Sequence, residues 1–233
     1  QADFPSTVQA YCKRVYQPTR GEQMPLMVRQ AWKTMITGRP GPVVLDVPFD
    51  IFKETAASEA PNPALWSANI SSRCGADPEG VIRAVDMLLA AKKPAIVIGQ
   101  GVRYGGATME LRALSERLQI PVASSASGLG AIPVDHPLSL GLVQRGGTYQ
   151  ATHACRQADV LMALGVRFDD RTSSSWIPGY SFTIPPTKLI HVDIDPEEIG
   201  RNYPVALGLM ADVRTFLRQV LAELDRRGHS KEP

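Results

Sequence analysis

The sequence predicts an α/β fold built on a doubly wound parallel sheet of about six strands, with helices on both faces. Two observations predict it. Short uncharged segments, such as Ala95–Ile98 and Val160–Leu164, alternate along the chain with segments whose apolar residues recur at helical spacing. Several of the short segments lead into glycine, arginine or aspartate, and open parallel sheets bind ligands beyond such carboxyl ends. The predicted fold is therefore Rossmann-like.

Helix and strand signals set the order of the elements. A helix is predicted to begin at Asp77-Pro78-Glu79, because aspartate suits the N-cap, proline the first turn, and glutamate the positive helix end. The elements that follow are strand 95–98, helix 107–118, strand 120–124, helix 149–157, strands 160–164, 188–194 and 204–210, and a final helix capped by Asp212. The stretch 128–147 between them is rich in loop-forming residues.

The first 50 residues hold too few elements for an independent core. They predict a helix near 23–36 and a strand at 43–47, bounded by Pro42 and Pro48. Because the chain starts at Gln1 without methionine, we expect residues 1–50 to be the end of a preceding domain. Residues 51–76 have linker composition, 77–228 form the central domain, and 229–233 are a tail.

Composition excludes several classes of protein. A net charge of +2 carries no electrostatic footprint for nucleic acid, and no apolar run approaches the ~20 residues that span a membrane. Cys12, Cys74 and Cys155 are too far apart for a disulfide framework or a zinc site, and the four histidines are scattered. We therefore expect a cytoplasmic protein that binds neither nucleic acid, membrane nor a metal cluster.

The segment "GQGVRYGGA" follows the predicted strand 95–98 and opens a helix. Glycines there allow backbone amides to approach a phosphate, but G-x-G-x-x-x-G is one residue longer than the dinucleotide fingerprint. The next strand ends in Ser124-Ser125, where an NAD site needs an acidic residue. An ordinary NAD site is disfavoured, and a phosphate-binding loop and a tight turn remain the two alternatives.

Charged residues follow three other predicted strands. In "GVRFDDR", Arg167 supplies a planar donor for a phosphate, and Asp169 or Asp170 could orient it; the alternative is a solvated loop of ion pairs. Asp193 can accept hydrogen bonds from a ribose, whereas Asp195 and Asp212 are equally well explained as helix N-caps. We expect His136 to be a loop hydrogen-bonder. No pattern of nucleophile and base accompanies these residues, so the sequence indicates a binder more clearly than a catalyst.

Five motifs in order carry a resemblance: "GRPGPVVLDVP", "HPLSLG", "ADVLMALGVRFDDR", "HVDIDPEEIG" and "MADV". Together they make the chain similar to the thiamine diphosphate-dependent acetohydroxyacid (acetolactate) synthases. The resemblance implies that the chain covers the end of the pyrimidine-binding domain and the central domain. It also implies a cofactor in the central domain, which is FAD in the synthases and ADP in some relatives.

The resemblance assigns the cofactor contacts residue by residue: Gly99, Gly101, Ser125, Ala126, Gly165, Arg167, Asp169, Asp193, Ile194, Asp212 and Val213. Two departures bear on the flavin. The synthases usually have "GMHG" where this chain has Gln144-Arg145-Gly146-Gly147, and often three glycines where it has "GQG". Relatives with the same architecture bind ADP or no nucleotide in place of FAD, and use other 2-keto acids or acyl donors.

The resemblance also implies an activity for the longer protein. It would decarboxylate a 2-keto acid such as pyruvate and join the product to a second carbonyl, using thiamine diphosphate and magnesium, as a homo-oligomer. The family's catalytic glutamate is expected upstream of Gln1 and its GDG motif beyond Pro233, so we expect this chain to be inactive alone. The rival hypothesis is a stand-alone nucleotide-binding or regulatory module.

Overall fold

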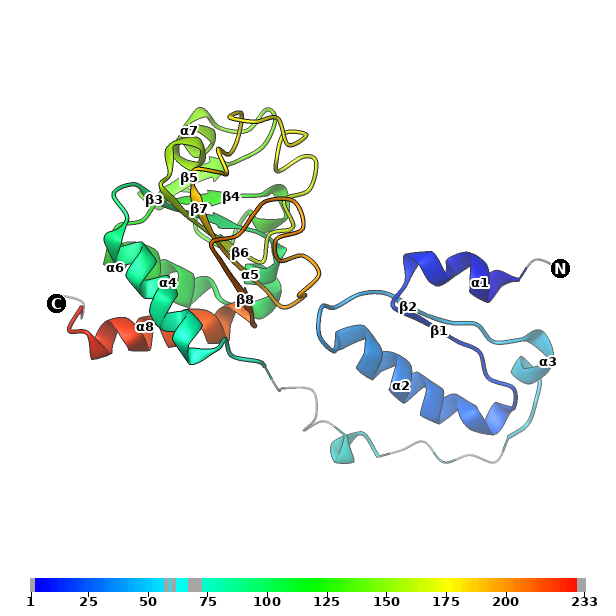
Figure 1. Cartoon of the computed structure of the whole chain (residues 1–233). Coiled ribbons are helices and arrows are strands. Elements are labelled where there is room, and N and C mark those ends of the chain that lie inside the picture. The colour runs from blue at the N-terminus through cyan, green and yellow to red at the C-terminus, as the bar shows by residue number, and fades with distance from the viewer. Residues whose placement is uncertain (1–2, 57–58, 60–61, 67–72, 230–233) are drawn as a thin grey trace. The chain divides into compact units, whose positions relative to one another are not determined.

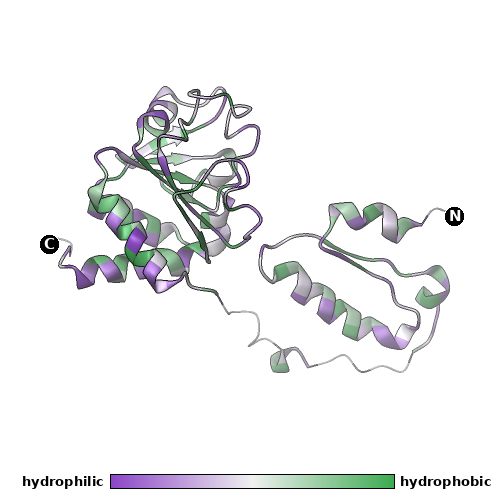
Figure 2. Cartoon of the chain, in the orientation of Figure 1, coloured by the Kyte–Doolittle hydropathy of each residue, from purple (hydrophilic) through white to green (hydrophobic). Residues whose placement is uncertain are grey.

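The computed structural model describes residues 3–56, 59, 62–66 and 73–229. The chain divides into two compact units, Gln1–Ser72 and Arg73–Pro233, and each is considered by itself (Figure 1). Figure 2 shows the strands of the second unit as mostly hydrophobic and its helices as banded, as one-sided burial requires.

The first unit is small. Its elements are α1 (Phe4–Val8), β1 (Arg14–Tyr16), α2 (Met24–Ile36), β2 (Val43–Leu45) and α3 (Phe49–Phe52), with short 3-10 turns at Gln9–Tyr11, Gly21–Gln23 and Pro63–Leu65. β1 and β2 pair in parallel, with Val15 opposite Val44. Among the described residues of this unit, the buried apolar side chains are Tyr16, Pro18, Ala31 and Ile51. These four side chains are far fewer than an independent core needs.

The second unit contains a six-stranded, all-parallel sheet, which confirms the predicted fold class. The strands are β3 (Pro94–Ile98), β4 (Val122–Ser124), β5 (Ser139–Leu142), β6 (Val160–Leu164), β7 (Lys188–Asp193) and β8 (Leu207–Met210). Their order across the sheet is β5-β4-β3-β6-β7-β8. The chain therefore winds outward in one direction from β3 and in the other direction from β6, which is the doubly wound pattern.

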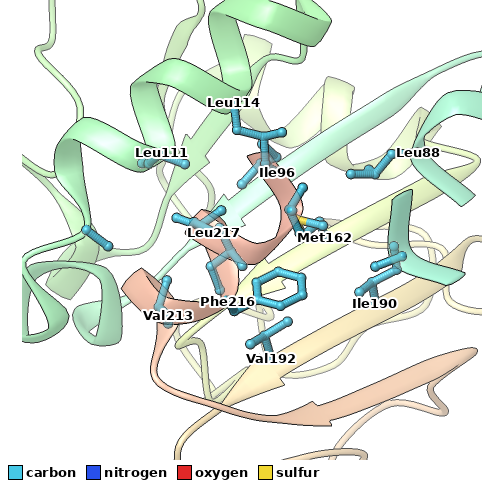
Figure 3. Close-up of a cluster of buried hydrophobic side chains, with 14 of the residues drawn as sticks. Leu88, Ile96, Leu111, Leu114, Met162, Ile190, Val192, Val213, Phe216 and Leu217 are labelled. Atoms are coloured by element: carbon cyan, nitrogen blue, oxygen red, sulfur yellow. The ribbon is translucent and has the colours of Figure 1, made fainter. Parts of the chain in front are cut away.

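Three helices cover one face of this sheet: α4 (Pro78–Ala90), α6 (Thr108–Leu118) and α8 (Val213–Arg226). Asp77 caps α4 by accepting a hydrogen bond from the Gly80 N–H, as the sequence predicted. Figure 3 shows Phe216 and Leu217 of α8 packed among side chains from α6 and from strands β3, β6 and β7. Alternate residues of each strand point into this core because side chains of a strand alternate between faces.

The other face is covered differently. One helix, α7 (Tyr149–Gln157), packs there together with the irregular segment 165–187, which connects β6 to β7. Phe168 and Phe182 of that segment are buried against the sheet, with ring centroids 5.2 Å apart. Helices do lie on both faces, as predicted, but a non-helical segment closes much of the second one.

Two elements lie where the sequence was expected to form loops. β5 falls inside the stretch 128–147, and α5 (Gln100–Gly105) falls inside the glycine segment after β3. β5 escaped prediction because it is a half-buried edge strand that contains Gly141 in a left-handed conformation (φ 83°). Its pairing with β4 shifts register between Val122 and Ala123, so local pattern carries little strand signal there.

Three further structural findings bear on function. Within the described ranges, no helix is both long and apolar enough to cross a bilayer. The same ranges contain no cluster of three or more side chains suited to hold a metal ion. Burial raises the pKa of the Cys155 thiol to about 12, so this cysteine is a packing residue of α7 rather than a nucleophile.

Leu217 tests the helical face of the core. Leu217→Ala should lower the free energy of unfolding by about 2–5 kcal/mol, because the side chain is fully buried and its loss leaves a cavity. Leu89→Ala on α4 is the matched control, since Leu89 is 36% exposed and should lose about 1 kcal/mol or less. Urea unfolding followed by circular dichroism measures both. Equal losses at the two positions would contradict the described core.

Candidate functional site

The carboxyl ends of the six strands form the candidate site. β3 and β6 are hydrogen-bonded neighbours, and the connections that leave them run to opposite sides of the sheet. This is the topological switch point, where open parallel sheets bind their ligands. The eleven residues named from the sequence all follow, or lie at, the carboxyl ends of β3, β4, β6, β7 and β8. The topology therefore brings them to one edge of the sheet.

The glycines at the switch point contact one another. The Gly99 N–H donates to the Leu164 carbonyl at 3.0 Å, and the Gly101 N–H donates to the Gly165 carbonyl at 3.4 Å. A Cβ on Gly99 would lie 2.0 Å from the Gly165 oxygen, and a Cβ on Gly101 2.7 Å from the Gly165 Cα. Glycine is required at these positions because the two backbones are in direct contact. This contact is what the tight-turn interpretation of the glycine segment predicted.

Arg167 is exposed at the same place. Its side chain has no hydrogen-bond or ion-pair partner in the part of the chain that the structure describes. Asp169 does not orient it, because the Asp169 carboxylate accepts a hydrogen bond from the Thr172 N–H at 2.8 Å and caps the following turn. The described part of "GVRFDDR" therefore contains neither the arginine–aspartate pair nor the ion-pair loop that the sequence suggested.

Phe168, the residue after Arg167, fixes the backbone of this loop by being buried. Phe168 is buried, and its ring lies edge-on to the rings of Phe182, His191 and Tyr203, at centroid distances of 5.2, 5.4 and 5.2 Å. Its φ of 51° places it in the left-handed region, which non-glycine residues adopt only when their surroundings enforce it. Burial of Phe168 therefore leaves Arg167 facing solvent at a defined place.

His191 was not identified from the sequence. It lies in β7 and is 1% exposed; its Nε2 donates to the Val166 carbonyl at 2.8 Å, and its Nδ1 accepts from the Gly200 N–H at 3.4 Å. Burial lowers the pKa of this imidazole, which keeps it neutral and able to make both contacts. A histidine inside an otherwise apolar strand is the only sequence signal that could have drawn attention to it.

The carboxylates at the ends of β7 and β8 have structural partners. Asp193 is buried and accepts a hydrogen bond from the Asp195 N–H at 3.0 Å. Asp212 caps α8, accepting from the Thr215 N–H and hydroxyl, both at 3.0 Å, and lies 3.4 Å from the Arg73 guanidinium. The cap explanation of Asp212 is confirmed, and Val213 after it is the buried first residue of the helix.

The remaining predicted residues lie on the same edge. The Ser125 N–H donates to the Ile98 carbonyl at 2.8 Å, and Ser125 is buried beside the exposed Ala126. Ile194 is half-buried directly after β7. His136 lies elsewhere, 3.2 Å from Glu116 and with its Nδ1 accepting from the Leu138 N–H, so it is the loop hydrogen-bonder that was expected.

Arg145 makes a contact, with Ser175, that the sequence did not predict. It follows β5, and its guanidinium donates to the Ser175 hydroxyl at 2.6 Å. Ser175 belongs to the segment 165–187, which thus reaches from the end of β6 to the end of β5. Ser174, Ser175 and Trp176 all have positive φ, between 51° and 57°. No local pattern predicts three consecutive left-handed residues without glycine, since the conformation depends on tertiary contacts.

Residues 81–220 match the family model described as "Thiamine pyrophosphate enzyme, central domain". The chain belongs to the thiamine pyrophosphate enzymes. The matched range covers all six strands of the sheet and the whole candidate site.

Curated proteins similar to this chain include acetolactate synthases. The chain is 36% identical over 214 residues to the probable acetolactate synthase large subunit of Methanocaldococcus jannaschii, covering 91% of this chain and 36% of that protein. It is 36% identical over 210 residues to the acetolactate synthase isozyme 3 large subunit of Escherichia coli, covering 88% and 35%. The acetolactate synthase of Mycobacterium bovis is 33% identical over 224 residues, with 96% and 35% covered. The chain thus spans about a third of the length of these relatives.

A solved structure supports the fold. The chain superposes on the crystal structure of benzoylformate decarboxylase from Polynucleobacter necessarius with a TM-score of 0.70, covering 89% of this chain and 37% of that one. The two sequences are 24% identical, so this likeness concerns the fold alone. The resemblance seen in the five sequence motifs is confirmed by the family match and the relatives.

Gly165 tests the backbone contact at the switch point. Gly165→Ala should lower the free energy of unfolding by about 1–2 kcal/mol for its left-handed backbone and about 1–3 kcal/mol more for the clash, since the new Cβ would lie 2.5 Å from the Gly101 Cα. Gly146→Ala is the control: its φ is also positive, but a Cβ there meets nothing within 4 Å. Chemical denaturation of both variants separates the two contributions, and equal losses would contradict the contact.

Proposed function

We propose that the six-stranded unit binds an adenine nucleotide, FAD or ADP, across the carboxyl ends of its strands. The observation that carries this proposal is Arg167, an exposed arginine without a described partner, held beside the topological switch point. A guanidinium offers a planar set of donors that matches phosphate oxygens. Arg167 therefore fits the diphosphate that FAD and ADP share.

The other proposed contacts lie on either side of Arg167. We propose that the adenosine half of the nucleotide contacts the ends of two strands: Asp193 and Ile194 at the end of β7, and Asp212 and Val213 after β8. We propose that the diphosphate lies over the backbone contact made by Gly99, Gly101 and Gly165. The remaining proposed contacts are Ser125, Ala126 and Asp169. All these residues lie along one edge of the sheet, at the carboxyl ends of its strands, where an extended nucleotide could contact them together.

We propose that ADP retains much of the affinity that FAD shows. The strand ends assigned to adenosine follow the pattern of the family, whereas the segment Gln144–Gly147, assigned to the flavin side, departs from it. There Arg145 is engaged with Ser175 at 2.6 Å. A charged side chain at this place offers less apolar surface to an isoalloxazine ring than the family's usual residues do. The purified chain is therefore expected to be colourless or to hold flavin weakly.

For the full-length protein, we propose acetolactate synthase-like activity. Thiamine diphosphate, with magnesium, supplies the carbanion chemistry by which such enzymes decarboxylate a 2-keto acid and join the product to a second carbonyl. The residues of this chain would supply the nucleotide platform: residues 77–228 as the central domain, 51–76 as a linker and 1–50 as the end of the pyrimidine-binding domain. A homo-oligomer in the cytoplasm, acting on pyruvate or another 2-keto acid, is proposed on the same grounds.

Arg167→Ala tests the nucleotide site. The variant should weaken ADP binding by about 1.5–3 kcal/mol, the magnitude of a hydrogen bond to a charged group. Arg226→Ala is the matched control, because Arg226 lies at the far end of α8 and pairs with Glu223 at 2.7 Å; its affinity for ADP should equal that of the wild type. Calorimetric titrations with ADP and FAD give the dissociation constants. An Arg167→Ala variant that binds both nucleotides like the wild type would refute the site.

The chain by itself should not form acetolactate. Neither the glutamate nor the GDG motif of the family is assigned to any residue of this sequence, so thiamine diphosphate has no family-type site here. The purified chain, supplied with thiamine diphosphate, magnesium and pyruvate, should produce no more acetolactate than a protein-free blank in a colorimetric assay. Formation clearly above the blank would overturn this proposal while leaving the nucleotide site untouched.

A further inference from the structure

Three consecutive carbonyl groups around Arg167 accept hydrogen bonds from side chains that lie at least eight residues away in the chain. The Val166 carbonyl accepts from His191 Nε2 at 2.8 Å. The Phe168 carbonyl accepts from the Trp176 indole N–H at 2.9 Å. The Arg167 carbonyl itself accepts from Asn202 Nδ2 at 3.0 Å. A loop backbone that is held at every peptide for three residues has little freedom to rotate, so the direction of the Arg167 side chain is defined at its base.

Asn202 makes two of these contacts from one atom. Its Nδ2 lies 3.0 Å from the Arg167 oxygen and 3.1 Å from the Phe168 oxygen. An amide nitrogen carries two hydrogens, so it can donate to two carbonyls at once. Two neighbouring carbonyls can meet one donor only if the peptide between them is turned, and the left-handed φ of 51° at Phe168 provides that turn. Asn202 therefore stabilises the unusual conformation on which the Arg167 position depends.

The three donors come from different parts of the chain. His191 lies in β7, Trp176 lies later in the segment 165–187, and Asn202 lies after the turn that begins at Pro196. Tyr203, next to Asn202, packs its ring 5.2 Å from that of Phe168. Polar and apolar contacts thus converge on the backbone of Arg167, while its guanidinium is left without a partner among the described residues. This is the arrangement of an arginine prepared in advance for a ligand.

We propose that Asn202 is a positioning residue for Arg167: by holding the carbonyls of Arg167 and Phe168, it presents the guanidinium to the diphosphate of the nucleotide. This proposal rests on the nucleotide site proposed above. Asn202 is exposed and does not contribute to the core. Its effect on binding is therefore separable from an effect on folding.

A double-mutant cycle tests the proposal with ADP as the probe. Asn202→Ala should weaken ADP binding about fivefold in the wild-type background, the magnitude of one neutral hydrogen bond. In the Arg167→Ala background the same change should have no effect, because nothing is left to position. Gln150→Ala, the loss of an exposed amide on α7, is the matched control and should leave ADP affinity unchanged in both backgrounds. Thermal unfolding of each variant confirms that it is folded.

The outcomes separate the two proposals. If Arg167→Ala weakens ADP binding while Asn202→Ala has no effect, or an equal effect in both backgrounds, the positioning role is overturned and the nucleotide site stands. If the wild-type chain binds neither ADP nor FAD, both proposals fail together. A fivefold loss that disappears in the Arg167→Ala background supports both, because a merely structural role of Asn202 would reduce affinity whether or not Arg167 is present.

Discussion

The contact between the turns that follow β3 and β6 is the constraint on which the second unit depends. β3 and β6 are neighbours in the centre of the sheet, and their carboxyl ends lie side by side. The two connections that follow must therefore leave the sheet in opposite directions from adjacent positions. Gly99 and Gly101 on one turn and Gly165 on the other let the two backbones touch, since any Cβ there would lie within about 2.0–2.7 Å of the opposite backbone. The glycines thus set the floor of the candidate site.

The two faces of the sheet are stabilised in different ways, and the site follows from that difference. α4, α6 and α8 bury one face in a continuous apolar core. On the other face, α7 covers only part of the sheet, and the segment 165–187 covers much of what remains. An irregular segment lacks the regular backbone hydrogen bonds of a helix, so its carbonyls depend on other donors, including side chains. His191, Trp176 and Asn202 supply those donors around Arg167.

Much of the fold could be read from local pattern. The cap at Asp77, the helical spacing in α4 and α8, and the apolar runs of β3 and β6 are set by residues close together in the chain. β5 could not be read in this way, because a short edge strand with a left-handed glycine takes its conformation from its neighbour β4. The sequence placed the candidate site residues correctly at strand ends, but it did not predict their partners. Asp169, for example, accepts a hydrogen bond from the Thr172 N–H and does not pair with Arg167.

The sequence by itself determined the fold class, the family and the identity of the loops at the strand ends, because periodicity, caps and ordered motifs are local properties of the chain. Only the tertiary structure decided what those loops do. It showed that the glycines accommodate each other's backbones, that Phe168 is buried so that Arg167 is exposed, and that Asn202, 35 residues away from Arg167 in sequence, holds its carbonyl. Contacts between residues so far apart depend on how the strands are ordered in the sheet, and no local pattern encodes that order.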